Sequence, residues 1–390
     1  MKLLIFDIET TGLDKINDQI IQFASLIIDT DTNKIINSYN TYVKPIGNYS
    51  ISLNAYFKNT YGQKIYKIAV NAGLSCPNRD GTLDTRGCIF CSKGGSGDFA
   101  VKLDESLGDE LAVQTDGKAS AGRKILSVKQ QIVQGKSRFN KETGDKFVIY
   151  FQAFTNTYGN PEYLRRIWTE ALEEENVVGI SIATRPDCLG KEIMEVLREL
   201  QDKFCSELDS HSKFIWVELG LQTIHDKTAE YIRRHYPLSE YEEAVRKLHK
   251  LSIPYITHVI LGLPGETKEE MLETVFYVEQ GVFEQDSHSK IKPFGIKLQL
   301  LHVLEDTDLA KDYRQGKFQT MEMDEYIDLV IDALQRINPE IVIHRVTGDG
   351  PKNILIAPTW SGNKKMVLNT LHKRMKEREA RQGDYSIMLW

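Results

Sequence analysis

Three cysteines lie within one short stretch of the sequence, at Cys76, Cys88 and Cys91. The stretch reads Cys-Pro-Asn-Arg-Asp-Gly-Thr-Leu-Asp-Thr-Arg-Gly-Cys-Ile-Phe-Cys and contains no histidine. Three thiolates without a sequence-near fourth ligand can hold three irons of a 4Fe–4S cluster, which leaves the fourth iron free to bind another molecule. A structural zinc site needs four ligands, and Cys188 or Cys205 would have to supply the fourth. The spacing and position favour the cluster over zinc.

The elements that must position these cysteines follow a regular pattern. From about Leu53 onward, strands alternate with long amphipathic helices, which is typical of parallel β/α units. Six strands are expected, at Tyr66–Asn71, Phe147–Ala153, Val177–Ala183, Phe214–Leu219, Tyr255–Leu261 and Gly295–His302. We therefore predict an α/β fold, a partial (β/α)6 TIM-type barrel. The cysteine stretch directly follows the first strand, and active sites of such barrels collect on the loops after the strands.

Composition excludes several classes of protein. The chain has 390 residues, of which 41% are hydrophobic, and a net charge of −6, which argues against a uniformly basic, nucleic-acid-coating surface. Five cysteines are too few for a disulfide scaffold, and no export signal opens the sequence, so we expect a reducing cytoplasm. No apolar run approaches the ~18–20 residues that span a bilayer, so no membrane association is expected.

The chain divides into three parts. Residues 1–52 are predicted to form a small β-meander, residues 53–305 the barrel with its cysteine loop, and residues 306–390 an extension that closes the barrel. The segment Lys364–Arg381 carries seven Lys or Arg and two Glu, so it is predicted to form a basic helix. Such a helix can contact RNA phosphate or simply face solvent, and the sequence leaves both open.

Charged and amide side chains interrupt the apolar strands at Arg185, Glu218 and Gln222. An unpaired buried charge costs several kcal/mol, so these groups need partners. A bound ligand would provide them, and so would an internal salt bridge between Arg185 and Glu218.

From about Leu53 to its end, the chain resembles the radical S-adenosylmethionine (SAM) superfamily, within it the YtqA/YhcC-like branch marked by Cys-Pro-Asn-Arg-Asp-Gly-Thr, here Cys76–Thr82. The spacing between the first two cysteines is longer than the commoner superfamily spacing. The resemblance implies a 4Fe–4S cluster on Cys76, Cys88 and Cys91, with SAM on the free iron. It also implies reductive cleavage of SAM to a 5′-deoxyadenosyl radical and a flavodoxin- or ferredoxin-like electron donor.

The resemblance further implies contacts with SAM. Gln152, Thr155 or Asn156 would meet the methionine amino group, where the superfamily usually has Gly-Gly-Glu, and a solvated strand end is the alternative. The other implied contacts are Arg185, Glu218, Gln222, Arg233, which resembles the arginine that meets the carboxylate, and Gly262 and Gly265 in an adenine-contacting turn.

Three segments, Thr184–Asp187, Glu218–Gln222 and His258–Gly265, also resemble the core of the Elongator catalytic subunit, which modifies the tRNA wobble uridine. The resemblance implies tRNA as a partner, without acetyl transfer, because no acetyltransferase domain follows. Near the C-terminus, His344, Arg345 and Asp349 are candidate substrate contacts, with sealing of the barrel an even alternative.

Residues 1–52 resemble the first motif of the DEDD (DnaQ-like) 3′–5′ exonucleases, Phe6–Asp14. In that family Asp7 and Glu9 would coordinate paired divalent metals. The remaining catalytic residues lie far downstream in such nucleases, where this chain has the barrel sequence, so we interpret the segment as a truncated fragment. A metal-dependent exonuclease and a zinc-stabilised binding module are the alternative functions. The oligomeric state stays open.

Overall fold

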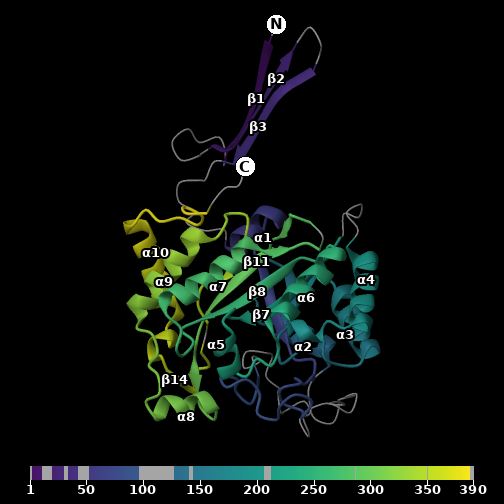
Figure 1. Ribbon diagram of the computed structural model, residues 1–390. Helices are drawn as coiled ribbons and strands as arrows, with labels where there is room; N and C mark the ends of the chain where they lie inside the picture. Colours follow the sequence, from purple (N-terminus) through teal and green to yellow (C-terminus); the bar gives the residue numbers. More distant parts are fainter. Residues whose placement is uncertain are drawn as a thin grey trace.

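A computed structural model describes residues 2–10, 20–29, 34–42, 52–95, 127–139, 144–205, 212–285, 287–348 and 350–386 (Figure 1). Of the first three ranges it describes only the strands. Asp349, one of the predicted substrate contacts, lies outside the described residues.

The centre of the fold is a sheet of seven parallel strands curled into a half-barrel, in the order β13-β11-β8-β7-β6-β5-β4. The strands are β4 (Ile65–Val70), β5 (Lys146–Phe151), β6 (Val177–Thr184), β7 (Phe214–Gln222), β8 (Tyr255–Leu261), β11 (Gly295–Leu300) and β13 (Val342–Arg345). The predicted partial barrel is confirmed, with one strand more than the six expected. The seventh, β13, pairs in parallel with β11.

Helices cover the outer face of the sheet, as the β/α alternation predicts. They are α3 (Pro161–Glu173), α4 (Lys191–Phe204), α6 (Leu238–Lys250), α7 (Lys268–Gln280) and α9 (Met323–Arg336), with α2 (Val128–Lys136) beside β4 and the short α5 (Asp226–Tyr231) after β7. Local signals fix where they begin. The Asn160 side chain caps α3 just before Pro161, and Thr267 forms a capping box with Glu270 at the start of α7.

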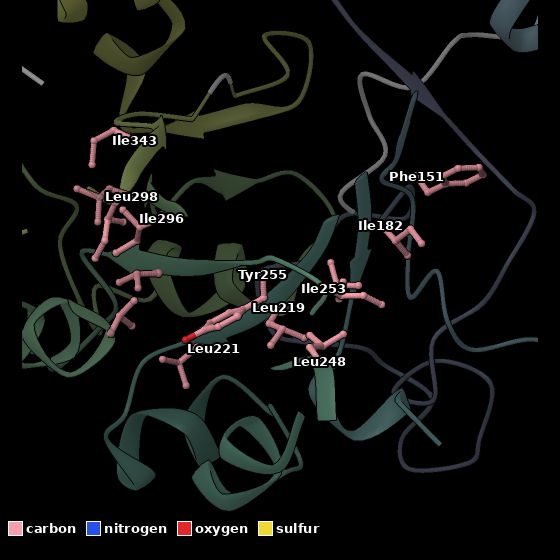
Figure 2. Close-up of a cluster of buried hydrophobic side chains, with 14 of the residues drawn as sticks. Phe151, Ile182, Leu219, Leu221, Leu248, Ile253, Tyr255, Ile296, Leu298 and Ile343 are labelled. Carbon is pink, nitrogen blue, oxygen red and sulfur yellow. The ribbon is translucent and has the colours of Figure 1, made fainter. Parts of the chain in front are cut away.

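Successive side chains along each strand point to opposite faces of the sheet, one facing the helices and the other facing the barrel interior. In β7, Val217, Leu219 and Leu221 are buried against the helices, whereas Glu218 belongs to the interior. Figure 2 shows Leu219 and Leu221 in this buried cluster. Side chains two residues apart share one face of a strand, so the same strand supplies core on one face and chemistry on the other.

Helix α1 (Leu53–Tyr61) seals the amino-terminal end of the half-barrel. Phe57 stacks on Trp216 with ring centroids 5.7 Å apart, in a buried cluster with the inward side chains of β4, β5, β6 and β8. The helix packs against β4 and β13, the two edge strands of the sheet. In Figure 1, α8 (Asp308–Arg314) and β14 (Leu355–Ala357) lie at the opposite end, where the strands finish.

The C-terminal residues pack against the barrel. Strand β14 pairs with β12 (Val303–Leu304), and α10 (Lys364–Glu377) lies on α9. The predicted basic helix is therefore present, but part of its charge is neutralised. Arg374 contacts Asp324 and Asp328 of α9 at 2.5 and 2.7 Å, and Arg378 contacts Asp328 at 2.8 Å.

The amino-terminal strands form the predicted meander, an antiparallel sheet of β1 (Lys2–Thr10), β2 (Ile20–Asp29) and β3 (Lys34–Tyr42). Asp7 and Glu9 both lie in β1. Two further pairs of short strands complete the described elements, β9 (Val282–Phe283) with β10 (Lys290–Ile291), and β12 with β14. The proposed boundaries between the three parts stay predictions. None of the helices described is both long and apolar enough to cross a membrane.

Candidate active site

The three cysteines of the loop after β4 line one cavity of about 270 Å³ at the carboxyl ends of the strands, here called the cluster pocket. Its lining comes from the cysteine loop, from β5 to β8 and β11 or the turns after them, and from Arg345 at the end of β13. The cavity therefore lies at the end of the strands where parallel barrels place their active sites.

Side chains within the cysteine loop hold it in shape. Asn78 is fully buried, and its amide nitrogen donates to Cys88 Sγ at 3.4 Å and to the Arg233 carbonyl at 2.8 Å. The Arg79 guanidinium donates to the carbonyls of Cys91 and Ser92 at 3.0 and 2.5 Å. Gly87 has φ +77°, and a Cβ there would lie 2.8 Å from Arg79 Nε, so this close turn favours glycine.

The thiols of Cys88 and Cys91 shift each other's pKa. The pKa of Cys88 is lowered to about 6, first because it accepts a hydrogen bond from Cys91 and also because of the nearby charge of Arg185, although burial opposes the shift. That hydrogen bond and burial raise the pKa of Cys91 well above its usual value. Burial also raises the pKa of Cys76. The lowered pKa of Cys88 and the N–H donor to its sulfur therefore fit a thiolate ligand at this one position. Among the described residues, no group of three or more His, Cys, Asp or Glu side chains is arranged to hold a metal ion.

The three candidates after β5 separate into two groups. Gln152 and Thr155 line the cluster pocket, whereas Asn156 is fully buried behind it. The backbone and side-chain nitrogens of Asn156 donate to the Ala183 carbonyl at 3.1 and 2.9 Å, tying the loop to β6. The geometry therefore leaves Gln152 and Thr155 facing a ligand, and gives Asn156 a positioning role.

The suggested salt bridge between Arg185 and Glu218 is wrong, because each has partners of its own. Arg185 donates to the two carboxylate oxygens of Asp187 at 3.0 and 2.6 Å and lies 4.9 Å from the Tyr236 ring centroid. Both Arg185 and Glu218 line the cluster pocket together with Gln222. Their contacts with SAM stay predictions.

Of two consecutive arginines, the structure brings the one not chosen into the pocket. The predicted contact, Arg233, forms an ion pair with Asp308 of α8 at 2.8 Å and is not among the described lining residues. Arg234 lines the pocket and donates to the carbonyls of Leu221, Thr223 and Tyr236, which leaves one buried terminal nitrogen without a partner among the described atoms. The sequence pattern Arg-Arg after a short helix cannot tell which side chain turns inward.

The two glycines predicted at the adenine turn do not line the pocket among its described residues. Both have φ +86°, and the backbone nitrogen of Gly262 donates to Met271 Sδ at 2.9 Å. Ile260, two residues before Gly262, is the side chain of this region that reaches the pocket. The two glycines thus fit a tight strand-to-helix turn.

The candidate substrate residues also divide. Arg345 lines the cluster pocket, whereas His344 packs against Trp216 and Phe294 with ring centroids 5.4 and 5.7 Å apart. Burial lowers the pKa of His344 well below its usual value, so the ring is neutral. His344 thus packs among aromatic side chains, but it also lines a neighbouring cavity, and neither ring nitrogen has a partner among the described atoms.

Sequence reasoning missed a buried polar network centred on Glu218, whose side chain is 0% exposed. Its carboxylate accepts hydrogen bonds from Ser181 at 2.6 Å, Lys67 at 3.2 Å and His258 at 2.7 Å, and from Lys297. Lys297 also donates to the Tyr150 hydroxyl at 3.1 Å, and Gln299 donates to His258 Nδ1 at 3.2 Å. Five strands besides β7 each contribute a polar side chain that points into the barrel to this network. The alternation of these polar residues with apolar ones along each strand was the sequence pattern that could have predicted it.

The network fixes the charges of its members. Burial alone would raise the pKa of Glu218, but the charges of Lys297 and Lys67 outweigh burial and hold it well below its usual value. Burial, reinforced by the charge of Lys297, lowers the pKa of His258 to about 4. A neutral imidazole that donates from Nε2 and accepts at Nδ1 satisfies both of its neighbours.

Family models match three segments of the chain. The model for the Radical SAM superfamily matches residues 85–278, that for the Radical_SAM C-terminal domain matches residues 293–377, and an Exonuclease model matches residues 4–57. The exonuclease match ends within α1, at the start of the barrel region.

Individual proteins give a consistent picture. The protein YtqA of Bacillus subtilis is 39% identical over 335 residues, which cover 86% of this chain and 92% of YtqA. The tRNA uridine(34) acetyltransferase of Methanocaldococcus jannaschii is 25% identical over 53% of this chain and 34% of that protein. The structure of Elp3 from Methanocaldococcus infernus, lacking its first 46 residues, has a TM-score of 0.54 and 15% identity, covering 82% of this chain and 64% of that one, which shows a shared fold.

Proposed function

The chain belongs to the radical SAM superfamily and is an iron–sulfur enzyme of that superfamily, and from this premise we propose that it reductively cleaves SAM to abstract hydrogen from a tRNA wobble uridine. The observation that carries the proposal is the convergence of Cys76, Cys88 and Cys91 on one cavity that ends seven parallel strands. The superfamily implies a 4Fe–4S cluster and SAM at this cavity.

The residues of the cluster pocket have distinct proposed roles. Cys76, Cys88 and Cys91 hold three irons as thiolates, and the Asn78 amide supports the Cys88 sulfur. The bound cluster supplies the electron that cleaves the sulfonium bond of SAM. Gln152 and Thr155 face the methionine amino group, and Arg234, which lines the pocket, is a better candidate for the carboxylate than Arg233, which pairs with Asp308.

Support for a tRNA substrate is of two kinds. A relative covering half of this chain is named for uridine 34 of tRNA. In addition, Lys365 and Lys376 of α10 are exposed, beside the arginines of this helix that pair with α9, and could contact RNA phosphate. We further propose a flavodoxin- or ferredoxin-like electron donor and a reducing cytoplasm, in which none of the five cysteines forms a disulfide.

The decisive experiment is anaerobic turnover. Reconstituted protein is reduced in the presence of SAM, with and without bulk tRNA, and 5′-deoxyadenosine is quantified by chromatography while digested tRNA nucleosides are analysed by mass spectrometry. We expect 5′-deoxyadenosine in both reactions and more with tRNA, together with a new or depleted wobble nucleoside. If no 5′-deoxyadenosine forms under any condition, the proposed reaction is wrong. If it forms without any change in tRNA nucleosides, the tRNA substrate is wrong.

A further inference from the structure

A second cavity, of about 290 Å³, adjoins the cluster pocket and shares Tyr150, Gln152 and Arg345 with it. It also contacts side chains of β4 and β13, the two edges of the sheet, and of α1 and α2. A cavity lined from both edge strands lies at the open side of the half-barrel. It therefore offers a side entrance to the space above the strands.

This cavity is rich in cations. Lys67, Arg138, Lys297 and Arg345 line it, and no Asp or Glu occurs among its described lining residues. We call it the cation pocket. Four basic side chains around one small cavity repel one another unless an anion is present, because attraction and repulsion between charges strengthen as water is excluded.

The nearest carboxylate neutralises only part of this charge. Glu218 accepts from Lys297 and from Lys67, so Lys297 and Glu218 together carry no net charge. Arg345 and Arg138 have no ion pair or side-chain hydrogen bond with any residue that the structure describes. His344 also lines this cavity, but burial lowers the pKa of its ring, so it adds no charge at neutral pH.

We propose that the cation pocket binds an anionic group of the substrate, a phosphate or a carboxylate, through the Arg345 guanidinium supported by Lys67 and Arg138. A guanidinium presents paired N–H donors that match the oxygens of either group. Because Arg345 lines both cavities, an anion held there would place the attached part of the substrate in the cluster pocket. This inference rests on the proposed function, in which that part is the site of hydrogen abstraction.

The test measures binding in the reconstituted, full-length protein. Inorganic phosphate and acetate are titrated separately by calorimetry at constant ionic strength, followed by uridine 5′-monophosphate against uridine. We expect saturable binding of at least one anion, and tighter binding of the monophosphate than of the nucleoside if phosphate is the natural group. Acetate binding more tightly than phosphate would assign the pocket to a carboxylate instead.

Three variants make the test specific to this cavity. Arg345→Gln should weaken anion binding by about 10-fold or more, the loss expected for one charged hydrogen-bond partner. Arg345→Lys keeps the charge and should retain part of the affinity. Lys129→Gln removes the same charge from an exposed position of α2 outside the described lining and should leave the affinity unchanged.

Folding is controlled in two ways. Because Arg345 has no described ionic partner, Arg345→Gln should melt close to the wild type, and Arg138→Gln at the exposed rim offers a second variant with a smaller effect. Equal anion affinity in the wild type and Arg345→Gln, or no saturable binding of either anion, would overturn the inference. Formation of 5′-deoxyadenosine by the wild type is measured separately, so failure of the cation pocket and failure of the proposed reaction are distinguishable.

Discussion

The cluster pocket and the Glu218 network lie in the interior of the same half-barrel, but they differ in whether their buried polar atoms have hydrogen-bond partners. At the ends of the strands, Asn78 and Arg234 each keep a buried polar atom without a partner among the described residues. In the middle of the strands, Glu218 has four donors around one carboxylate. The difference indicates that the upper layer, which is the cluster pocket, keeps polar atoms available for a ligand, while in the lower layer the Glu218 carboxylate is supplied with donors by the chain itself.

This contrast also separates activity from stability. A buried polar network whose members are all paired rigidifies a structure, and removal of one member leaves the others uncompensated. A ligand site, in contrast, tolerates the loss of a side chain because no other part of the chain depends on it. Substitutions in the two layers should therefore have different consequences.

The largest effect is expected on cofactor content in the upper layer. Cys88→Ser should reduce iron from about four per chain to fewer than about one and abolish 5′-deoxyadenosine formation, because one of three cluster ligands is lost. Iron analysis and visible absorption of anaerobically reconstituted protein measure this. Cys188→Ser is the matched control, since Cys188 is also a partly buried thiol but is not among the described residues of the cluster pocket. Full iron content in Cys88→Ser would contradict the assigned ligands.

The next largest effect is on stability in the lower layer. Glu218→Gln should lower the free energy of unfolding by about 3–5 kcal/mol, because Lys297, only 3% exposed, loses its counter-charge. Denaturant unfolding of the cofactor-free protein measures this. The exposed Glu195→Gln should change the value by less than about 0.5 kcal/mol. Adding Lys297→Met to Glu218→Gln should restore part of the lost stability. A loss below about 1 kcal/mol in Glu218→Gln alone would show that the network does not stabilise the fold.

A smaller effect is expected from pH, through His258. Its pKa is about 4 in the folded protein and about 6.5 when unfolded, so between these values the unfolded chain binds more protons and stability falls as the pH falls. Acidification from pH 7 to pH 5 should lower the free energy of unfolding by about 2 kcal/mol through this group. Denaturant unfolding at both pH values measures the loss. His258→Gln should remove most of it, and an unchanged pH dependence in that variant would show that His258 is not the titrating group.

Much of the fold was predictable because it depends on periodicity. The alternation of apolar residues predicted six of the seven parallel strands, and cap residues such as Asn160 and Thr267 mark where helices begin. Strand β13 was missed because its four residues end in His344 and Arg345, which interrupt the apolar pattern. Its place at the edge of the sheet is determined by pairing with β11, a contact that sequence alone does not reveal.

The sequence predicted that Cys76, Cys88 and Cys91 belong to one site, and they line one pocket, whereas the other lining residues were harder to predict. The cysteines could be identified from the sequence because three thiols close together in one loop are typical of iron–sulfur cluster ligands. Arg233 and Arg234 are neighbours of the same type, and only the ion pair with Asp308 decides that Arg233 turns away. The partners of Glu218 come from separate strands, so each looked like an isolated polar residue until the barrel brought them together.

The packing of α1 against both edge strands has a consequence for synthesis of the chain. The helix leaves the ribosome early, whereas β13, its partner on the other edge, is among the last strands made. The aromatic surface around Phe57 therefore has no complete partner while most of the barrel is being translated. The packing of α1 against β13 joins segments that are distant in sequence, so it should be a late and slow step of folding. Until it is complete, the exposed apolar surface makes the nascent chain prone to aggregation.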